Sequence, residues 1–152
     1  MKFILYITIC LCLVVYWFFS ISNPKLEKFG GDYITIFSTC VVWHQDIVSV
    51  TSLGFAHAYT IRTNRLDRVR PLFRNIDGES ITLSGKEKDQ VLLLFPHHNY
   101  VSSQRLGNMV VTNLYSNRGL DFIMDGRNRI NLQVAKRGDV VTIGWPVILG
   151  GF

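Results

Sequence analysis

Residues 130–145 read INLQVAKRGDVVTIGW, and this stretch decides the kind of fold that the chain adopts. Ile130, Leu132 and Val134 alternate with more polar neighbours, which is the two-residue period of a β-strand with one apolar and one mostly polar face. A second β-rich run, 140–145, follows Lys136-Arg137-Gly138-Asp139. Because glycine adopts a positive φ readily and aspartate tolerates it, this tetrapeptide predicts a hairpin turn between two antiparallel strands.

The same pattern continues outward from this hairpin. Strands are expected at 109–115 and 120–124, with turns at 116–119 and 125–128, so that the last part of the chain forms a four-stranded antiparallel meander. Further strands are expected at 33–43, 47–51, 54–62, 81–84 and 90–95. Eight or nine short strands predict an all-β domain, a small up-and-down β-barrel with a two-sheet sandwich as the alternative. One or two helical turns are expected over 66–73, where Pro71 limits the helix.

The N-terminal segment is of a different kind. Phe3 to Ile21 is a run of nineteen residues without a charged side chain, and ~20 apolar residues in a helix span the ~30 Å hydrocarbon core of a bilayer. We therefore expect a single-pass transmembrane anchor over 1–22, a linker over 23–32 and a β-rich soluble domain over 33–152. The alternative is a signal peptide cleaved after Ser22, which leaves a secreted or periplasmic β-domain.

Cysteine use and charge bear on location and partners. Cys40 is the one cysteine outside the expected anchor, and no Asn-x-Ser/Thr acceptor occurs in the chain. Both features favour a cytoplasmic domain on the membrane, the inner membrane if the source is bacterial. After residue 22, fifteen Lys or Arg face eleven Asp or Glu. This excess suits an anionic membrane surface or a phosphate-bearing ligand and is too small for a protein that binds duplex nucleic acid.

The strongest charge feature is a run of five arginines within thirteen residues, opposed only by Asp67. Its members are Arg62, Arg65, Arg68, Arg70 and Arg74. Guanidinium groups bind phosphate through two parallel hydrogen bonds. The run therefore predicts a site for phosphate groups, either on lipid headgroups or on a nucleotide. The alternative is a solvated connector whose arginines pair with scattered carboxylates.

Basic residues also occupy the predicted hairpin turns. Successive turns of an antiparallel meander alternate between its two ends, so the turns at 116–119 and 136–139 are expected at the same end. Arg118 is then expected near Lys136 and Arg137, as a basic rim around a ligand mouth. The alternative is that these exposed charges serve solubility alone.

One strand offers candidates for a cavity wall. On the expected strand 54–62, Phe55, His57 and Tyr59 share one face and are candidates for lining a ligand cavity. The alternative is a packed core that contains a hydrogen-bonded His57. No metal site and no cofactor are expected, because the histidines and cysteines lack the spacing of zinc ligands.

No catalytic motif is found. Residues 136–141 resemble a segment of the membrane-bound signal peptidases, but the Ser-Met-Pro nucleophile motif of that family is absent. Phosphate-cradling glycine loops, nucleophile elbows and paired helical histidines are absent too. The chain is therefore expected not to be an enzyme.

These observations favour a membrane-anchored binding domain whose partner is the lipid bilayer surface, another protein or a second copy of the chain. The layout, a hydrophobic N-terminal segment joined to a compact β-domain, also resembles the membrane-anchored β-barrel effectors of bacterial cyclic-oligonucleotide antiphage systems. The resemblance implies a cytosolic barrel that binds a nucleotide and drives assembly of the membrane segments. It covers the layout and no motif, so it assigns no residue.

Overall fold

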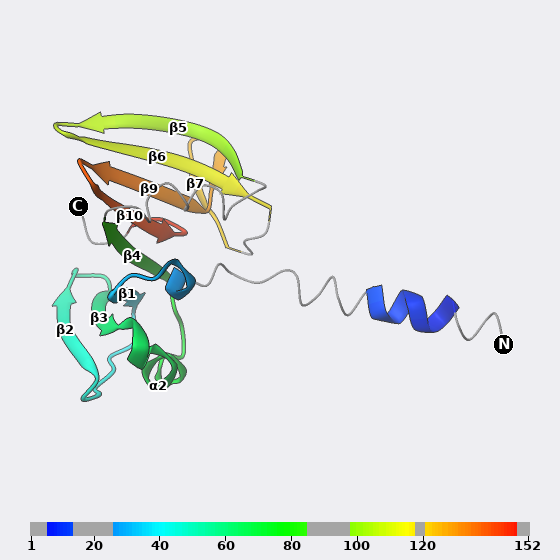
Figure 1. Cartoon of the computed structure of the whole chain (residues 1–152), viewed down its shortest axis with the longest axis horizontal. Helices are drawn as coiled ribbons and strands as arrows, with labels where there is room; N and C mark the ends of the chain where they lie inside the picture. Colours follow the sequence, from blue (N-terminus) through cyan, green and yellow to red (C-terminus); the bar gives the residue numbers. More distant parts are fainter. Residues whose placement is uncertain (1–5, 14–25, 85–97, 118–120, 149–152) are drawn as a thin grey trace.

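The computed structural model describes residues 6–13, 26–84, 98–117 and 121–148 (Figure 1). Residues 6–13 are helical and exposed, and the other described segments form a β-rich domain. Most of the predicted anchor over 1–22, the predicted strand 90–95 and Arg118 lie outside the described residues. Within the described part of the chain, no helix has the length and apolar character needed to cross a bilayer.

The described residues contain ten strands and a few short helical turns. The strands are β1 (Tyr33–Ser38), β2 (Ile47–Ser52), β3 (His57–Arg62), β4 (Gly78–Ser84), β5 (His98–Leu106), β6 (Met109–Ser116), β7 (Ile123–Asp125), β8 (Asn128–Ile130), β9 (Leu132–Arg137) and β10 (Val140–Trp145). The helical turns of the domain are η1 (Leu26–Phe29), η2 (Thr63–Arg65), α2 (Leu66–Val69) and η3 (Arg70–Leu72). This composition confirms the all-β prediction.

Eight of the strands form one sheet in the order β2-β3-β1-β4-β10-β9-β6-β5, and every pair of neighbours is antiparallel. The predicted up-and-down order is wrong, because β4 pairs with β10 and β6 pairs with β9. The predicted four-stranded meander is also wrong, because β7 and β8 form a separate two-stranded sheet. Among the described strands no pairing joins β2 to β5, so hydrogen bonds close no barrel, and the large sheet is not divided into a sandwich of two.

A glycine begins the loop of each of the three tight hairpins among the described residues. Gly107, Gly126 and Gly138 each have a φ near +60° and each is the first residue of a two-residue loop. No other residue type has a positive φ among those described, so the second loop residue has a negative φ, as in type II′ turns. The predicted hairpin turns at 125–128 and 136–139 are thus confirmed.

The main core lies on one face of the sheet. Inward residues of the central strands pack together, among them Ile34, Tyr59, Ile81 and Ile143. The residues between β3 and β4, 63–77, are called the connector here, and they cover this face with Leu66, Val69 and Phe73. Leu132, predicted to face inward, is 1% exposed, which confirms the assigned face of β9. A smaller cluster of Met109, Val111, Ala135 and Ile148 occupies another part of the sheet.

One polar residue interrupts the strand that the sequence predicts as continuous. Asn131 separates β8 from β9 and is 2% exposed. Its Oδ1 accepts a hydrogen bond from the backbone N–H of Ser116, and its Nδ2 donates to the carbonyl of Ser116, both at 2.7 Å. The side chain therefore pairs with β6 as a strand backbone would, at the point where the chain passes from the β7–β8 hairpin into the large sheet.

The folded domain begins before the predicted boundary at residue 33. Leu26 is fully buried in the main core, and a Cβ on Gly31 would lie 2.8 Å from the side chain of Ile81. Residues 26–32, assigned above to the linker, are thus packed onto the sheet. This placement shortens the stretch between the apolar N-terminal run and the domain.

Candidate functional site

The five arginines lie in different environments, Arg62 at the end of β3 and the other four in the connector. Leu66 and Val69 are three residues apart on α2 and are buried, so the residues between them point outward. Arg62, Arg65, Arg68 and Arg74 are all exposed, whereas Arg70 is partly buried. Pro71 lies in the first turn of η3, where the missing N–H removes no helical hydrogen bond, and the helical stretch ends at Leu72 as the sequence predicts.

Arg70 joins three parts of the fold. Its Nη2 lies 3.1 Å from Oε2 of Glu27 on η1 and 3.1 Å from Oε2 of Glu79 on β4. Of the five arginines, Arg70 therefore follows the alternative interpretation, in which the guanidinium pairs with carboxylates. The pairing ties η1, the connector and the sheet together at one point.

Glu79 is a buried carboxylate beside Arg70. It is 3% exposed and is paired in register with Trp145, whose indole Nε1 is buried without a hydrogen-bond partner among the described residues. Burial raises the pKa of Glu79 from 4.5 to about 7, although Arg70 lowers it. Desolvation of the carboxylate thus outweighs the attraction of the neighbouring guanidinium.

The sequence interpretation missed Glu27 and Glu79. Glu79 stands two residues before Ile81 and four before Leu83, so the two-residue period of a strand places it on the core face. That signal was available, but the expected strand began at 81. Glu27 carries no comparable signal, because its role depends on η1 lying against the connector.

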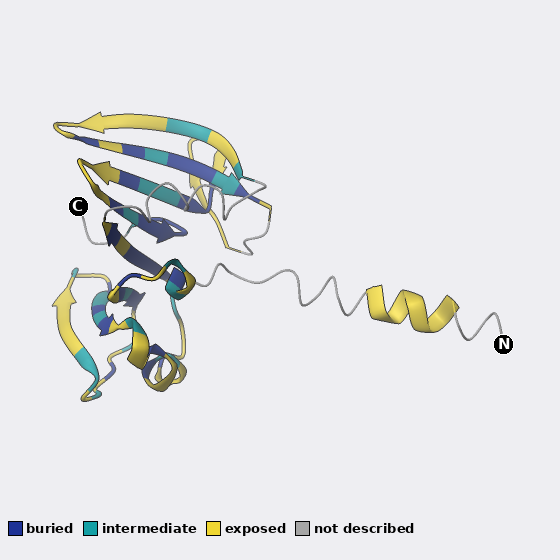
Figure 2. Cartoon of the chain, in the orientation of Figure 1, coloured by how far each residue is buried: buried dark blue, intermediate teal, exposed yellow. Residues whose placement is uncertain are grey.

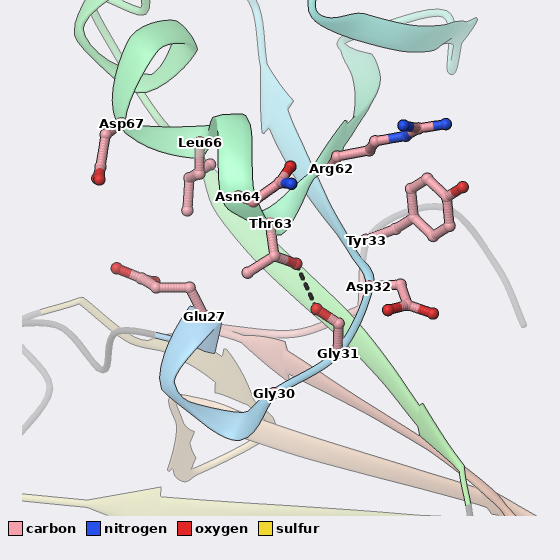
Figure 3. Close-up of a pocket in the computed structure, with 10 residues that line it drawn as sticks. All are labelled: Glu27, Gly30, Gly31, Asp32, Tyr33, Arg62, Thr63, Asn64, Leu66 and Asp67. Atoms are coloured by element: carbon pink, nitrogen blue, oxygen red, sulfur yellow. Dashed lines mark hydrogen bonds between the residues drawn. The ribbon is translucent and has the colours of Figure 1, made fainter.

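A polar hollow lies beside the connector (Figure 3). It has a volume of about 570 Å³ and is open to solvent. Its wall combines the carboxylates of Glu27, Asp32 and Asp67 with a single guanidinium, that of Arg62. The threonine hydroxyl of Thr63 donates to the carbonyl of Gly31 and holds the two walls together (Figure 3). This wall carries more negative than positive groups, so it does not favour a phosphate ligand.

The predicted basic rim is not formed as expected. Met109 pairs with Arg137, and Leu114 pairs with Leu132, so the turn at 136–139 lies at the start of β6. The chain leaves β6 toward residue 118 at the other end of that strand. The prediction that the turns at 116–119 and 136–139 share one end is therefore wrong, and its cause is the missing meander. Lys136 and Arg137 are exposed, and Arg118 lies outside the described residues.

The three candidates for a cavity wall differ in burial, although the rings of His57 and Tyr59 are neighbours with centroids 6.1 Å apart. Phe55 precedes β3 and is 71% exposed, while His57 is partly buried. Tyr59 is buried in the main core, where its hydroxyl donates to the carbonyl of Cys40 at 2.8 Å and accepts from the N–H of Val42 at 3.2 Å. Its ring packs against Phe73. Tyr59 thus serves the core, as in the alternative interpretation, and the three side chains do not come together around one hollow.

No set of three metal-ligating side chains comes together among the described residues. His44 and Asp46 form a local contact, 3.7 Å between Nδ1 and Oδ2. The candidate site that remains consists of the exposed arginines of the connector and the adjacent hollow. The pairing of Arg70 with Glu27 attaches the connector to η1. Comparisons of this chain with protein-family models, with curated proteins and with solved structures gave no match.

Proposed function

We propose that this protein is a single-span membrane protein whose β-domain binds an anionic membrane surface through the exposed arginines of the connector. The observation that carries the proposal is the Arg70 pairing. It joins η1, where the chain enters the domain, to the segment that bears Arg65, Arg68 and Arg74. A membrane that holds the N-terminal run therefore also keeps Arg65, Arg68 and Arg74 of the connector near its surface.

Chain length supports this arrangement. The apolar run ends at Ile21, and Leu26 is fixed in the core. The five steps between them extend to about 18 Å at most. Headgroup layers occupy roughly 5–8 Å on each side of the hydrocarbon core. If residues 3–21 cross the membrane, Leu26 at the start of η1 lies within about 13 Å of the headgroups.

The exposed charges of η1 and the connector fit lipid headgroups. Arg65, Arg68 and Arg74 are exposed, as is Lys28 on η1. Each basic residue close to an anionic leaflet contributes about 1 kcal/mol, so four contribute about 4 kcal/mol when all of them reach it. Leu72 is 45% exposed in the same segment and adds an apolar side chain that fits the interface. Anionic lipids are enriched in cytoplasmic leaflets, which agrees with a cytoplasmic domain.

The alternative function, a nucleotide sensor like the antiphage effectors, has less support from the geometry. A nucleotide needs a concave site with cationic groups directed into it. The hollow beside the connector is lined by the carboxylates of Glu27, Asp32 and Asp67. Arg65, Arg68 and Arg74 are not part of its wall. An extended anionic surface matches outward-pointing arginines better than a single small ligand does.

The test uses the full-length chain in nanodiscs of zwitterionic lipid, with and without anionic lipid. Hydrogen exchange is measured by mass spectrometry on peptides that cover 63–74. We expect slower exchange only on anionic nanodiscs, with the effect lost in high salt, because the Debye length falls from ~10 Å at 0.1 M to ~3 Å at 1 M. The double variant Arg65→Gln with Arg68→Gln should lose the effect.

The matched control removes the same charge elsewhere. Arg105 on β5 and Arg127 in the β7–β8 turn are both exposed, so Arg105→Gln with Arg127→Gln keeps the connector intact. This control should behave as the unchanged protein does. Equal exchange on both kinds of nanodisc, or equal losses in the two double variants, would contradict the proposal. Slower exchange that requires a cyclic nucleotide, with discrimination between nucleotides of equal charge, would favour the sensor instead.

A further inference from the structure

One edge of the large sheet is left open in an unusual way. β2 is the terminal strand, and its sequence from Ile47 to Ser52, IVSVTS, contains no charge, no proline and no glycine. Every residue from 48 to 52 is exposed, and Figure 2 shows β2 exposed over most of its length at the outer end of the sheet. Proteins normally protect such an edge with lysine, proline or a covering segment. Among the residues that the structure describes, the one protective feature of this edge is an irregularity of register between Ile47 and Ser49.

The surroundings of this edge are apolar. Val48 is 55% exposed and Val50 is 43% exposed. The flanking loops add Val41, Trp43 and Phe55, which are 64%, 84% and 71% exposed. Across residues 41–58 the only carboxylate is Asp46, and there is no lysine or arginine. An uncharged strand edge among large exposed apolar side chains is typical of an interaction surface, because unpaired backbone groups and apolar area are both available.

We infer that β2 is a self-association edge, at which two copies of this chain pair their β2 strands antiparallel about a two-fold axis. The strand itself argues for a second copy. A two-fold antiparallel pair places one residue opposite itself, and the pairing centred on Val50 uses residues 48–52 of both copies. Val50 then faces Val50 of the other copy, Ser49 faces Thr51, and Val48 faces Ser52. No charge meets a like charge, which is the usual obstacle to self-pairing.

The opposite edge differs from β2. β5 carries Arg105 and His98, and pairing this strand with itself brings copies of a cationic side chain to the interface. Pairing β2 of one copy with β5 of the next gives an open chain of molecules rather than a closed dimer. The β2 pair is closed, and it joins the two eight-stranded sheets into one continuous sheet. This inference does not depend on the proposed membrane contact.

The first experiment measures mass against concentration for the full-length chain in detergent by analytical ultracentrifugation. A reversible dimer is expected. Val50→Lys places two lysines opposite each other and should raise the dissociation constant about tenfold or more, since about 1.4 kcal/mol suffices for a tenfold change. Val50→Glu should do the same. A mixture of the two variants should restore dimers, because each pair then contains one lysine and one glutamate. Val50 lies on an exposed edge, and thermal unfolding checks that both variants remain folded.

The second experiment reports the register. In a background with Cys10, Cys12 and Cys40 replaced by alanine, Val50→Cys should form an intermolecular disulfide on mild oxidation. Cα atoms of directly opposed residues in an antiparallel pair lie about 4.5–5.5 Å apart, which is within the Cα separation of a disulfide. Gln104→Cys on β5 is the matched control and should form little. A monomer up to about 100 μM, well above the micromolar range of weak specific dimers, would overturn the inference. So would dimers that Val50→Lys leaves unchanged, or disulfides that form equally fast at both positions.

Discussion

The buried carboxyl of Glu79 predicts a specific dependence of stability on pH. Burial raises its pKa from 4.5 to about 7 in the folded protein, while the unfolded chain keeps the ordinary value. Between these values the folded state holds a proton that the unfolded state has released. The contribution of this group to the free energy of unfolding therefore has its full value below pH 4.5. It falls as the pH rises from 4.5 to about 7 and does not change further above that pH.

The magnitude follows from the size of the shift. One unit of pKa corresponds to 1.36 kcal/mol, so this shift corresponds to about 3 kcal/mol at most. Domains of this size are stable by roughly 5–15 kcal/mol. Losing about 3 kcal/mol between pH 5 and pH 8 is therefore a large effect. Glu79→Gln removes the titrating group and keeps a polar side chain beside Arg70.

The assay is urea unfolding of the full-length chain at pH 5 and pH 8, followed by tryptophan fluorescence. Trp145 is paired with Glu79 in the sheet and is 4% exposed, so it reports on this part of the core. Other groups titrate in the same range, and the informative quantity is the difference between the variant and the unchanged protein. Glu79→Gln should gain about 3 kcal/mol relative to the unchanged protein on going from pH 5 to pH 8.

The control is Asp125→Asn, which makes the same carboxyl-to-amide change at an exposed turn. It should keep the pH dependence of the unchanged protein. If Glu79→Gln and the unchanged protein lose stability in parallel between pH 5 and pH 8, the carboxyl of Glu79 is not desolvated as described, and the reasoning fails.

Two further predictions concern the polar break in the core and the N-terminal run. Asn131→Ala removes the two buried hydrogen bonds that its side chain makes with the backbone of Ser116, so it should cost about 2–4 kcal/mol in urea unfolding. The exposed Asn128→Ala should change stability by less than ~0.5 kcal/mol, and equal effects of the two substitutions would contradict this role of Asn131. Leu13→Arg places a charge inside the apolar run at a cost of about 2.5–3.5 kcal/mol for insertion; the protein should move from the membrane fraction to the soluble fraction, and unchanged sedimentation with membranes in high salt would rule out the anchor.

The glycine turns and most strands are readable from the chain because their causes are local. Gly126 and Gly138 carry the positive φ of tight hairpins, and any chain with these residues between β-rich runs favours a turn there. The inward face of β9 follows from alternation alone, and Leu132 is buried as expected. β5 was missed because its sequence, HNYVSSQRL, lacks an apolar face, and all but a few of its residues are exposed.

The order of the strands depended on contacts between distant residues. β4 lies beside β10 although more than fifty residues separate them, and no local pattern specifies that pairing. The pairing of β6 with β9 placed the turn at 136–139 at the start of β6, away from the turn that follows β6, so the expected basic rim does not form.

For the five arginines, too, the sequence determined some properties and the tertiary structure decided others. By composition the chain determines that the connector is strongly basic, and the spacing of Leu66 and Val69 determines which arginines point outward. Arg70 pairs with Glu27 and Glu79 and so joins η1 to the connector. This pairing depends on the packing of the connector against the sheet, which only the tertiary structure decides. Turn chemistry and alternation act over a few residues, whereas burial of a charge and the choice of its partners depend on which distant segments exclude water around it.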